Sequence, residues 1–105
     1  MPNDRISGFL GLCRKAGKLV LGFDICVEAL QKGNAELVLI ARDCSERTAR
    51  EIRRTAEKNG REARVLPLNM DEISFAVAKR AGVLAVCDSG FAKKINELLD
   101  GMHTA

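Results

Sequence analysis

The chain lacks the features of several large protein classes. None of its apolar runs approaches the roughly 20 residues that span a membrane. Asp4 and Arg5 stand where a signal peptide would carry an apolar block. The four cysteines form no CxxC pair and His103 is the only histidine, so the closely spaced ligands of a structural zinc site are missing. We therefore expect a cytoplasmic protein without a metal or cofactor, in which Cys13, Cys26 and Cys87 are buried free thiols.

Motifs for catalysis or nucleotide binding are also missing. The sequence contains no G-x-S-x-G, no G-x-x-x-x-G-K-[ST] and no G-x-G-x-x-G run. Asp88-Ser89-Gly90 follows an apolar run, but these are ordinary residues for capping a helix. Asp24 and Glu28 could serve acid/base chemistry or hold a hard cation, yet no third ligand lies near them in sequence. We therefore predict a binding protein that is not an enzyme.

The composition is typical of a soluble globular domain. A length of 105 residues, 47% of them hydrophobic, predicts one domain over residues 1–105. Seventeen Lys and Arg against 14 Asp and Glu give a formal net charge of +3, which favours an anionic partner weakly. Taken alone, each basic cluster is typical of a solvated surface. The basic clusters lie at residues 13–18, 46–64, 78–82 and 91–95.

Helical and extended patterns alternate along the chain. Apolar residues at helical spacing predict helices over 4–16, 22–32, 45–59, 69–82 and 91–101. Asn69 and Glu72, three residues apart, resemble a capping box at the start of the fourth of these helices, and Gly82 ends it. Short apolar runs predict strands over 19–21, 35–41, 63–68 and 83–87, and Pro67 ends the third or confines it to an edge. This alternation predicts an α/β fold with a small sheet between helices, and the short connections favour parallel neighbours for most of that sheet.

The run KLVLGFDICVEALQKG joins a predicted strand to a predicted helix at Gly22. A glycine at this junction permits close approach of the backbone, and the first N–H groups of a helix can bind phosphate oxygens. Helical spacing places Ile25 and Cys26 on the buried face of the helix. The same spacing places Asp24 and Glu28 side by side on the exposed face.

Basic residues stand near the ends of two predicted helices. Arg14, Lys15 and Lys18 lie just upstream of the Gly22 junction, and Lys79 and Arg80 lie at another helix end. If the fold brings these groups together, they form a basic rim around the glycine. A basic rim of this kind is the footprint of an RNA site.

Two long segments, LVLGFDICVEALQKGNAELVLIARD and MDEISFAVAKRAGVLAVCDSGFAKKI, resemble a known superfamily. It comprises small RNA-binding ribosomal proteins, including the archaeal large-subunit protein seven-Ae and the eukaryotic large-subunit protein thirty-e. The runs RKAGKLVLG and DSGFAKKI resemble its bacterial YlxQ-like branch. The resemblance implies a three-layer α-β-α sandwich with a small mixed four-stranded sheet. It also implies binding of ribosomal or other structured RNA through the kink-turn, a sharply bent internal loop, by a monomer that can associate with the ribosome.

The family's RNA motif, a Gly-x-Asn-Glu-x-x-Lys run that opens the second helix, is only partly present. Gly22 matches the glycine, but Asp24, Ile25 and Glu28 stand at the Asn, Glu and Lys positions. Asp24 offers acceptors only, and Glu28 repels a phosphate that a lysine would attract. A loop after the fourth helix assists binding in the family. The expected RNA-binding residues are therefore Arg14, Lys15, Lys18, Gly22, Phe23, Asp24, Glu28, Lys79 and Arg80.

Two other functions remain open on the sequence alone. The chain could be a protein-interaction module that docks a basic translation or RNA-processing factor on the acidic face of the second helix. Phe23 or Phe91, if exposed, would then be the apolar anchor. An enzyme that acts on a small phosphorylated ligand is a third alternative.

Overall fold

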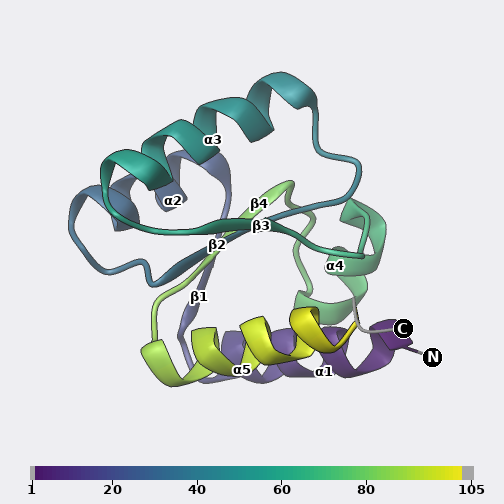
Figure 1. Ribbon diagram of the computed structural model, residues 1–105. Helices are drawn as coiled ribbons and strands as arrows, with labels where there is room; N and C mark the ends of the chain where they lie inside the picture. The colour runs from purple at the N-terminus through teal and green to yellow at the C-terminus, as the bar shows by residue number, and fades with distance from the viewer. Residues whose placement is uncertain (1, 103–105) are drawn as a thin grey trace.

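Helices and strands alternate along the whole described chain. The computed structural model describes residues 2–102 (Figure 1). Its elements are α1 (Pro2–Lys15), β1 (Leu19–Leu21), α2 (Phe23–Gln31), β2 (Leu37–Ile40), α3 (Glu46–Lys58), β3 (Ala63–Val65), α4 (Met70–Val77), β4 (Val83–Val86) and α5 (Ser89–Gly101). Every helix within this range is too short or too polar to cross a membrane.

The four strands form one mixed sheet in the order β1-β4-β2-β3. β2 and β3 are parallel, whereas β4 lies between β1 and β2 and runs antiparallel to both. The helices α2 and α3 cover one face of the sheet, and α1, α4 and α5 cover the other (Figure 1). The predicted α-β-α sandwich with a mixed sheet is confirmed. The expectation that most neighbours are parallel is wrong, because β4 inserts between two strands that run against it.

The central strands β2 and β4 supply both hydrophobic cores. Leu37 and Leu39 pack into the core under α1, α4 and α5, while Val38 and Ile40 pack into the core under α2 and α3. Successive side chains of a strand point to opposite faces of the sheet, so a strand covered on both sides must be apolar throughout. The continuous apolar runs of the sequence follow from this position. β3 is an edge strand that ends before Pro67, as predicted.

The helix α4 begins as predicted and ends early. Asn69 and Glu72 form a capping box: the Asn69 Oδ1 accepts from the Glu72 N–H at 2.8 Å, and the Glu72 Oε1 accepts from the Asn69 N–H at 2.9 Å. The helix stops at Val77 because Ala78 adopts the left-handed conformation, with φ of 62°. The predicted stop at Gly82 is therefore wrong. Residues 78–82 instead form the loop that leads into β4.

Ile25 departs from its predicted position on the buried face of α2. Its side chain is 47% exposed, whereas Cys26, Ala29 and Leu30 are buried. Successive residues of a helix are about 100° apart around its axis, so Ile25 lies roughly 90° from the centre of the stripe that those three residues form. α2 therefore buries a narrower face than its apolar residues suggest.

The cysteines divide into two buried and two partly exposed thiols. Burial raises the pKa of the Cys13 thiol to about 11 and that of Cys26 to about 12. Burial also raises the pKa of Cys44 and Cys87, but both thiols keep some exposed surface, so the expectation that Cys87 is buried holds only in part.

We expect a thiol reagent to modify Cys44 and Cys87 of the folded protein well before Cys13 and Cys26. Only the thiolate reacts, and the two buried thiols are both shielded and almost fully protonated at about pH 8. Timed alkylation followed by mass spectrometry of the peptides measures the order, with the urea-unfolded chain as the control in which all four react alike. Early modification of Cys26 would contradict this arrangement.

Candidate nucleic-acid interface

Gly22 links β1 to α2 at one end of the sheet. Its N–H donates to the carbonyl oxygen of Val83, the first residue of β4, at a N···O distance of 2.9 Å. Its φ of 117° and ψ of 150° fall in a region that is nearly exclusive to glycine. Gly22 is the N-cap of α2, and no side chain caps this helix. The first N–H groups of α2 therefore have no side-chain acceptor and can bind an anion.

The loop of residues 78–82 reaches the same end of the sheet. The Gly82 carbonyl oxygen accepts a hydrogen bond from the N–H of Ala41, the residue after β2, at 2.8 Å. The next residue, Val83, accepts the hydrogen bond from Gly22. The C-terminal end of β2, the start of β4 and the start of α2 are thus joined by backbone hydrogen bonds. We call this region the Gly22 end.

Two predicted cations lie in this loop and differ in their surroundings. Arg80 is exposed, and its Nε donates to the Asp71 Oδ1 at 3.1 Å. Lys79 is also exposed and makes no hydrogen bond or ion pair with any residue between 2 and 102. The structure therefore places Lys79 and Arg80 in the loop that leads into the Gly22 end, and the Lys79 charge has no partner within residues 2–102.

The other predicted cations lie elsewhere. The Lys18 carbonyl oxygen accepts from the Cys87 N–H at 2.8 Å, at the opposite end of β1. A strand rises about 3.3 Å per residue, so the backbones of Lys18 and Gly22 are roughly 13 Å apart. Arg14 and Lys15 end α1, which covers the other face of the sheet. The continuous rim expected around Gly22 is therefore divided into two separate groups.

The acidic face of α2 carries less charge than the sequence suggests. The Glu28 Oε1 accepts from the Lys32 Nζ at 2.7 Å, and this hydrogen bond and the lysine's charge lower the pKa of the Glu28 carboxyl. Lys32 thus offsets the negative charge of Glu28, which stands where the family motif has a lysine. Asp24 remains exposed in the first turn of α2, where a carboxylate interacts favourably with the helix dipole. The Asp24 carboxylate therefore repels an anion that approaches the same N–H groups.

The two candidate aromatic anchors are partly buried. Phe23 packs against the core under α2 and α3, and the Phe91 ring lies 5.3 Å from that of Phe9, centroid to centroid. Phe75 on α4 is instead 93% exposed. The signal that could have found Phe75 was helical spacing, which places it opposite Ile73, Ala76 and Val77, the residues of α4 that pack inward. The predicted site residues did not include it because they followed the glycine junction and the basic clusters.

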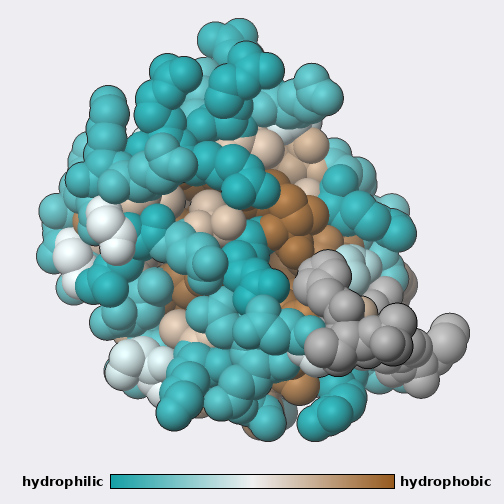
Figure 2. All heavy atoms as spheres, viewed as in Figure 1, coloured by the Kyte–Doolittle hydropathy of each residue, from teal (hydrophilic) through white to brown (hydrophobic). Residues whose placement is uncertain are grey.

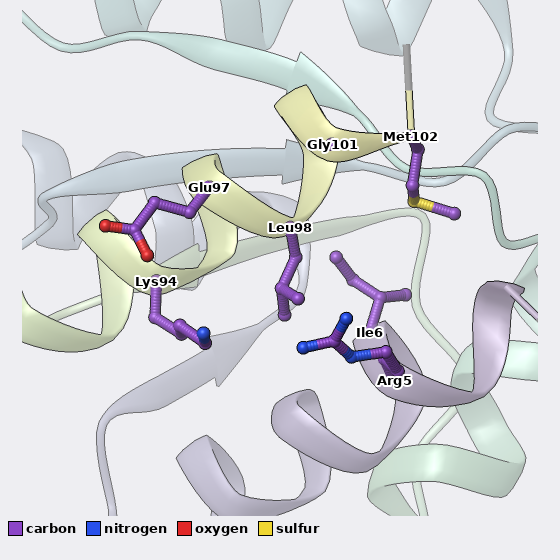
Figure 3. A pocket seen from close by; sticks show the side chains of 7 residues that line it. All are labelled: Arg5, Ile6, Lys94, Glu97, Leu98, Gly101 and Met102. Carbon is purple, nitrogen blue, oxygen red and sulfur yellow. The ribbon is translucent and has the colours of Figure 1, made fainter. Parts of the chain in front are cut away.

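A separate hollow lies between α1 and α5 and has a volume of about 520 Å³ (Figure 3). Arg5 and Lys94 line it together with the apolar side chains of Ile6, Leu98 and Met102. It belongs to the layer opposite α2 and is therefore separate from the Gly22 end. His103, the only histidine, lies outside the described residues.

Comparison with known proteins identifies the family. The sequence model of the ribosomal protein L7Ae/L30e/S12e/Gadd45 family matches residues 4–95. The chain is 31% identical over 93 residues to the RNA-binding protein YlxQ of Enterococcus faecium, covering 88% of each chain. It is 33% identical over 96 residues to the RNA-binding protein YlxQ of Bacillus subtilis, covering 87% of this chain and 91% of the other.

A solved structure agrees with these sequence relatives. A Bacillus halodurans protein of unknown function superposes with a TM-score of 0.84 at 27% identity, covering 90% of this chain and 95% of that one. The family match spans most of the chain, and the resemblance seen in the sequence is confirmed. The chain belongs to the ribosomal protein L7Ae/L30e/S12e/Gadd45 family.

Proposed function

We propose that this protein binds structured RNA, a kink-turn or a related bent internal loop, at the Gly22 end and does not catalyse a reaction. The observation that carries the proposal is the position of the uncapped N-terminus of α2 beside the loop that holds Lys79, joined by the hydrogen bond from Gly22 to Val83. The relatives named as RNA-binding proteins support the same class of partner.

The groups at the Gly22 end, and Phe75 on the helix that precedes the loop of residues 78–82, have distinct roles in this proposal. A phosphate binds the free N–H groups of α2, and Lys79 binds a neighbouring phosphate. Asp24 accepts a hydrogen bond from the amino group of a guanine. Phe75, in the last turn of α4, offers an exposed ring on which an unpaired base can stack. Phosphate contacts position the RNA, while the carboxylate and the ring select unpaired bases.

A binding titration at two salt concentrations tests the proposal. It compares a kink-turn RNA with a fully paired RNA of equal length. We expect tighter binding of the kink-turn at both concentrations, because recognition of a bend adds to the salt-dependent attraction to phosphates. Equal affinity for the two RNAs at both concentrations would contradict the proposal.

Restoring two family residues should tighten kink-turn binding. In the double variant Asp24→Asn, Glu28→Lys, the carboxylate that repels a phosphate near the α2 N–H groups is removed and a phosphate-binding lysine is added. We expect about tenfold or tighter binding and a salt slope steeper by about one. The introduced lysine would face Lys32, one turn further along the helix, and this repulsion costs the helix a few tenths of a kcal/mol.

The matched control for this variant is Glu62→Gln, Glu97→Lys, which makes the same change of net charge on exposed side chains away from the Gly22 end. Electrophoretic mobility or fluorescence anisotropy measures both variants on the same RNA. A gain no greater than that of the control would indicate that only net charge matters and that the RNA binds elsewhere.

A further inference from the structure

The helix α3 presents a row of basic side chains to solvent. The row consists of Arg47, Arg50, Arg54 and Lys58. At about 100° per residue, these four positions fall within an arc of roughly 80° around the helix axis. The buried residues Ile52 and Ala56 lie on the opposite side. The row therefore points directly away from the core, and the acidic residues of α3 lie on its two flanks.

Most of this row has no acidic partner. Arg47 pairs with Glu51, at 3.3 Å between Nε and Oε1. Arg50, Arg54 and Lys58 form no hydrogen bond or ion pair with any residue that the structure describes. Like charges four residues apart on a helix repel each other. Repulsion within the row thus opposes the stability of α3, and within the described residues only Arg47 of the row has a bonded acidic partner to offset it.

The basic row of α3 begins close to the Gly22 end. β2 ends at Ile40, Ala41 binds Gly82 at the Gly22 end, and α3 starts after its N-cap Ser45. From Arg47 to Lys58 the helix rises by about 16 Å. Figure 2 shows hydrophilic side chains gathered over the layer in which Figure 1 places α3. The cations therefore start near the Gly22 end and extend away from it along the same layer as α2.

We infer that the basic row of α3 is a second RNA-contact surface, which binds the phosphates of a duplex arm extending from the RNA held at the Gly22 end. This inference rests on the proposed function for its first contact. The chemistry fits because arginine and lysine bind phosphate oxygens without reading the bases. The row adds affinity and orients the arm, and it adds no sequence preference.

The test compares two variants on two RNAs. The variant Arg50→Gln, Arg54→Gln removes two charges from the row, and the control Lys93→Gln, Lys94→Gln removes two exposed charges from α5, on the other face of the sheet. Each is titrated with a kink-turn RNA that has a long duplex arm and with the same RNA cut short. Glutamine is a good helix former, so both variants should fold. Thermal unfolding verifies this.

We expect the α3 variant to lose at least about tenfold in affinity for the long-armed RNA, with a salt slope lower by about two, and to bind the short RNA like the parent. The variant Arg50→Lys, Arg54→Lys should retain long-arm binding. A loss on the long RNA no larger than that of the α5 control overturns the inference, as does an equal loss on both RNAs. If the unaltered protein does not prefer the kink-turn to paired RNA, only the proposed function is overturned. The role of α3 is still decided by comparing the α3 and α5 variants on the long-armed and shortened RNAs.

Discussion

Replacing Gly22 with alanine is expected to lower the free energy of unfolding by about 1–3 kcal/mol. With φ of 117° and ψ of 150°, this residue has a backbone conformation that a Cβ makes unfavourable. Apart from the adjacent residues, no described atom lies within 4 Å of the position that a Cβ would take, so the cost is backbone strain and not a collision. Urea unfolding measures it, and the melting temperature should fall by roughly 4–8 °C for each kcal/mol.

Gly8→Ala is the matched control for this variant. Gly8 lies inside α1 with a φ that alanine can adopt and with open space around its Cβ position. Alanine there should stabilise the protein by up to about 1 kcal/mol, because glycine loses more conformational freedom in a helix. If Gly22→Ala were as stable as the parent, the junction between β1 and α2 would have to relax without strain, and the argument for a required glycine would be lost.

Reversing the charge of Lys79 should weaken RNA binding roughly 10- to 100-fold at moderate salt. The change removes a charge-assisted contact with phosphate and puts a repelling carboxylate in its place. Lys79 makes no bond within residues 2–102, so Lys79→Glu should leave stability nearly unchanged. Fluorescence anisotropy with a kink-turn RNA measures the affinity.

Lys18→Glu makes the same charge change at the opposite end of β1. The backbone separation of roughly 13 Å from Gly22 exceeds the Debye length of about 8 Å at physiological salt, so its effect should stay below about threefold. Equal losses in the two variants would indicate that binding follows net charge. That result would remove the Gly22 end as the site.

Local sequence patterns determined most of the elements. The apolar runs predicted β2 and β4 because each strand is covered on both faces. The Asn69 and Glu72 spacing predicted the start of α4, since a capping box needs only residues three apart. Gly22 was recognisable as a junction for the same reason: the turn from strand to helix is made by its own backbone. The end of α4 was predicted too late because the left-handed conformation of Ala78 has no signal in the sequence.

The tertiary structure alone decided which residues share a site. The insertion of β4 between β1 and β2 brings Val83 into a hydrogen bond with Gly22, so the loop that holds Lys79 leads into the end of the sheet where this glycine lies. The same arrangement places Lys18, which is close to Gly22 in the chain, at the other end of the strand. Periodicity reports which face of an element is apolar, but strand order depends on pairing between distant segments. For that reason the sequence by itself determined the family, the layers and the glycine junction, and only the fold decided which charges gather around it.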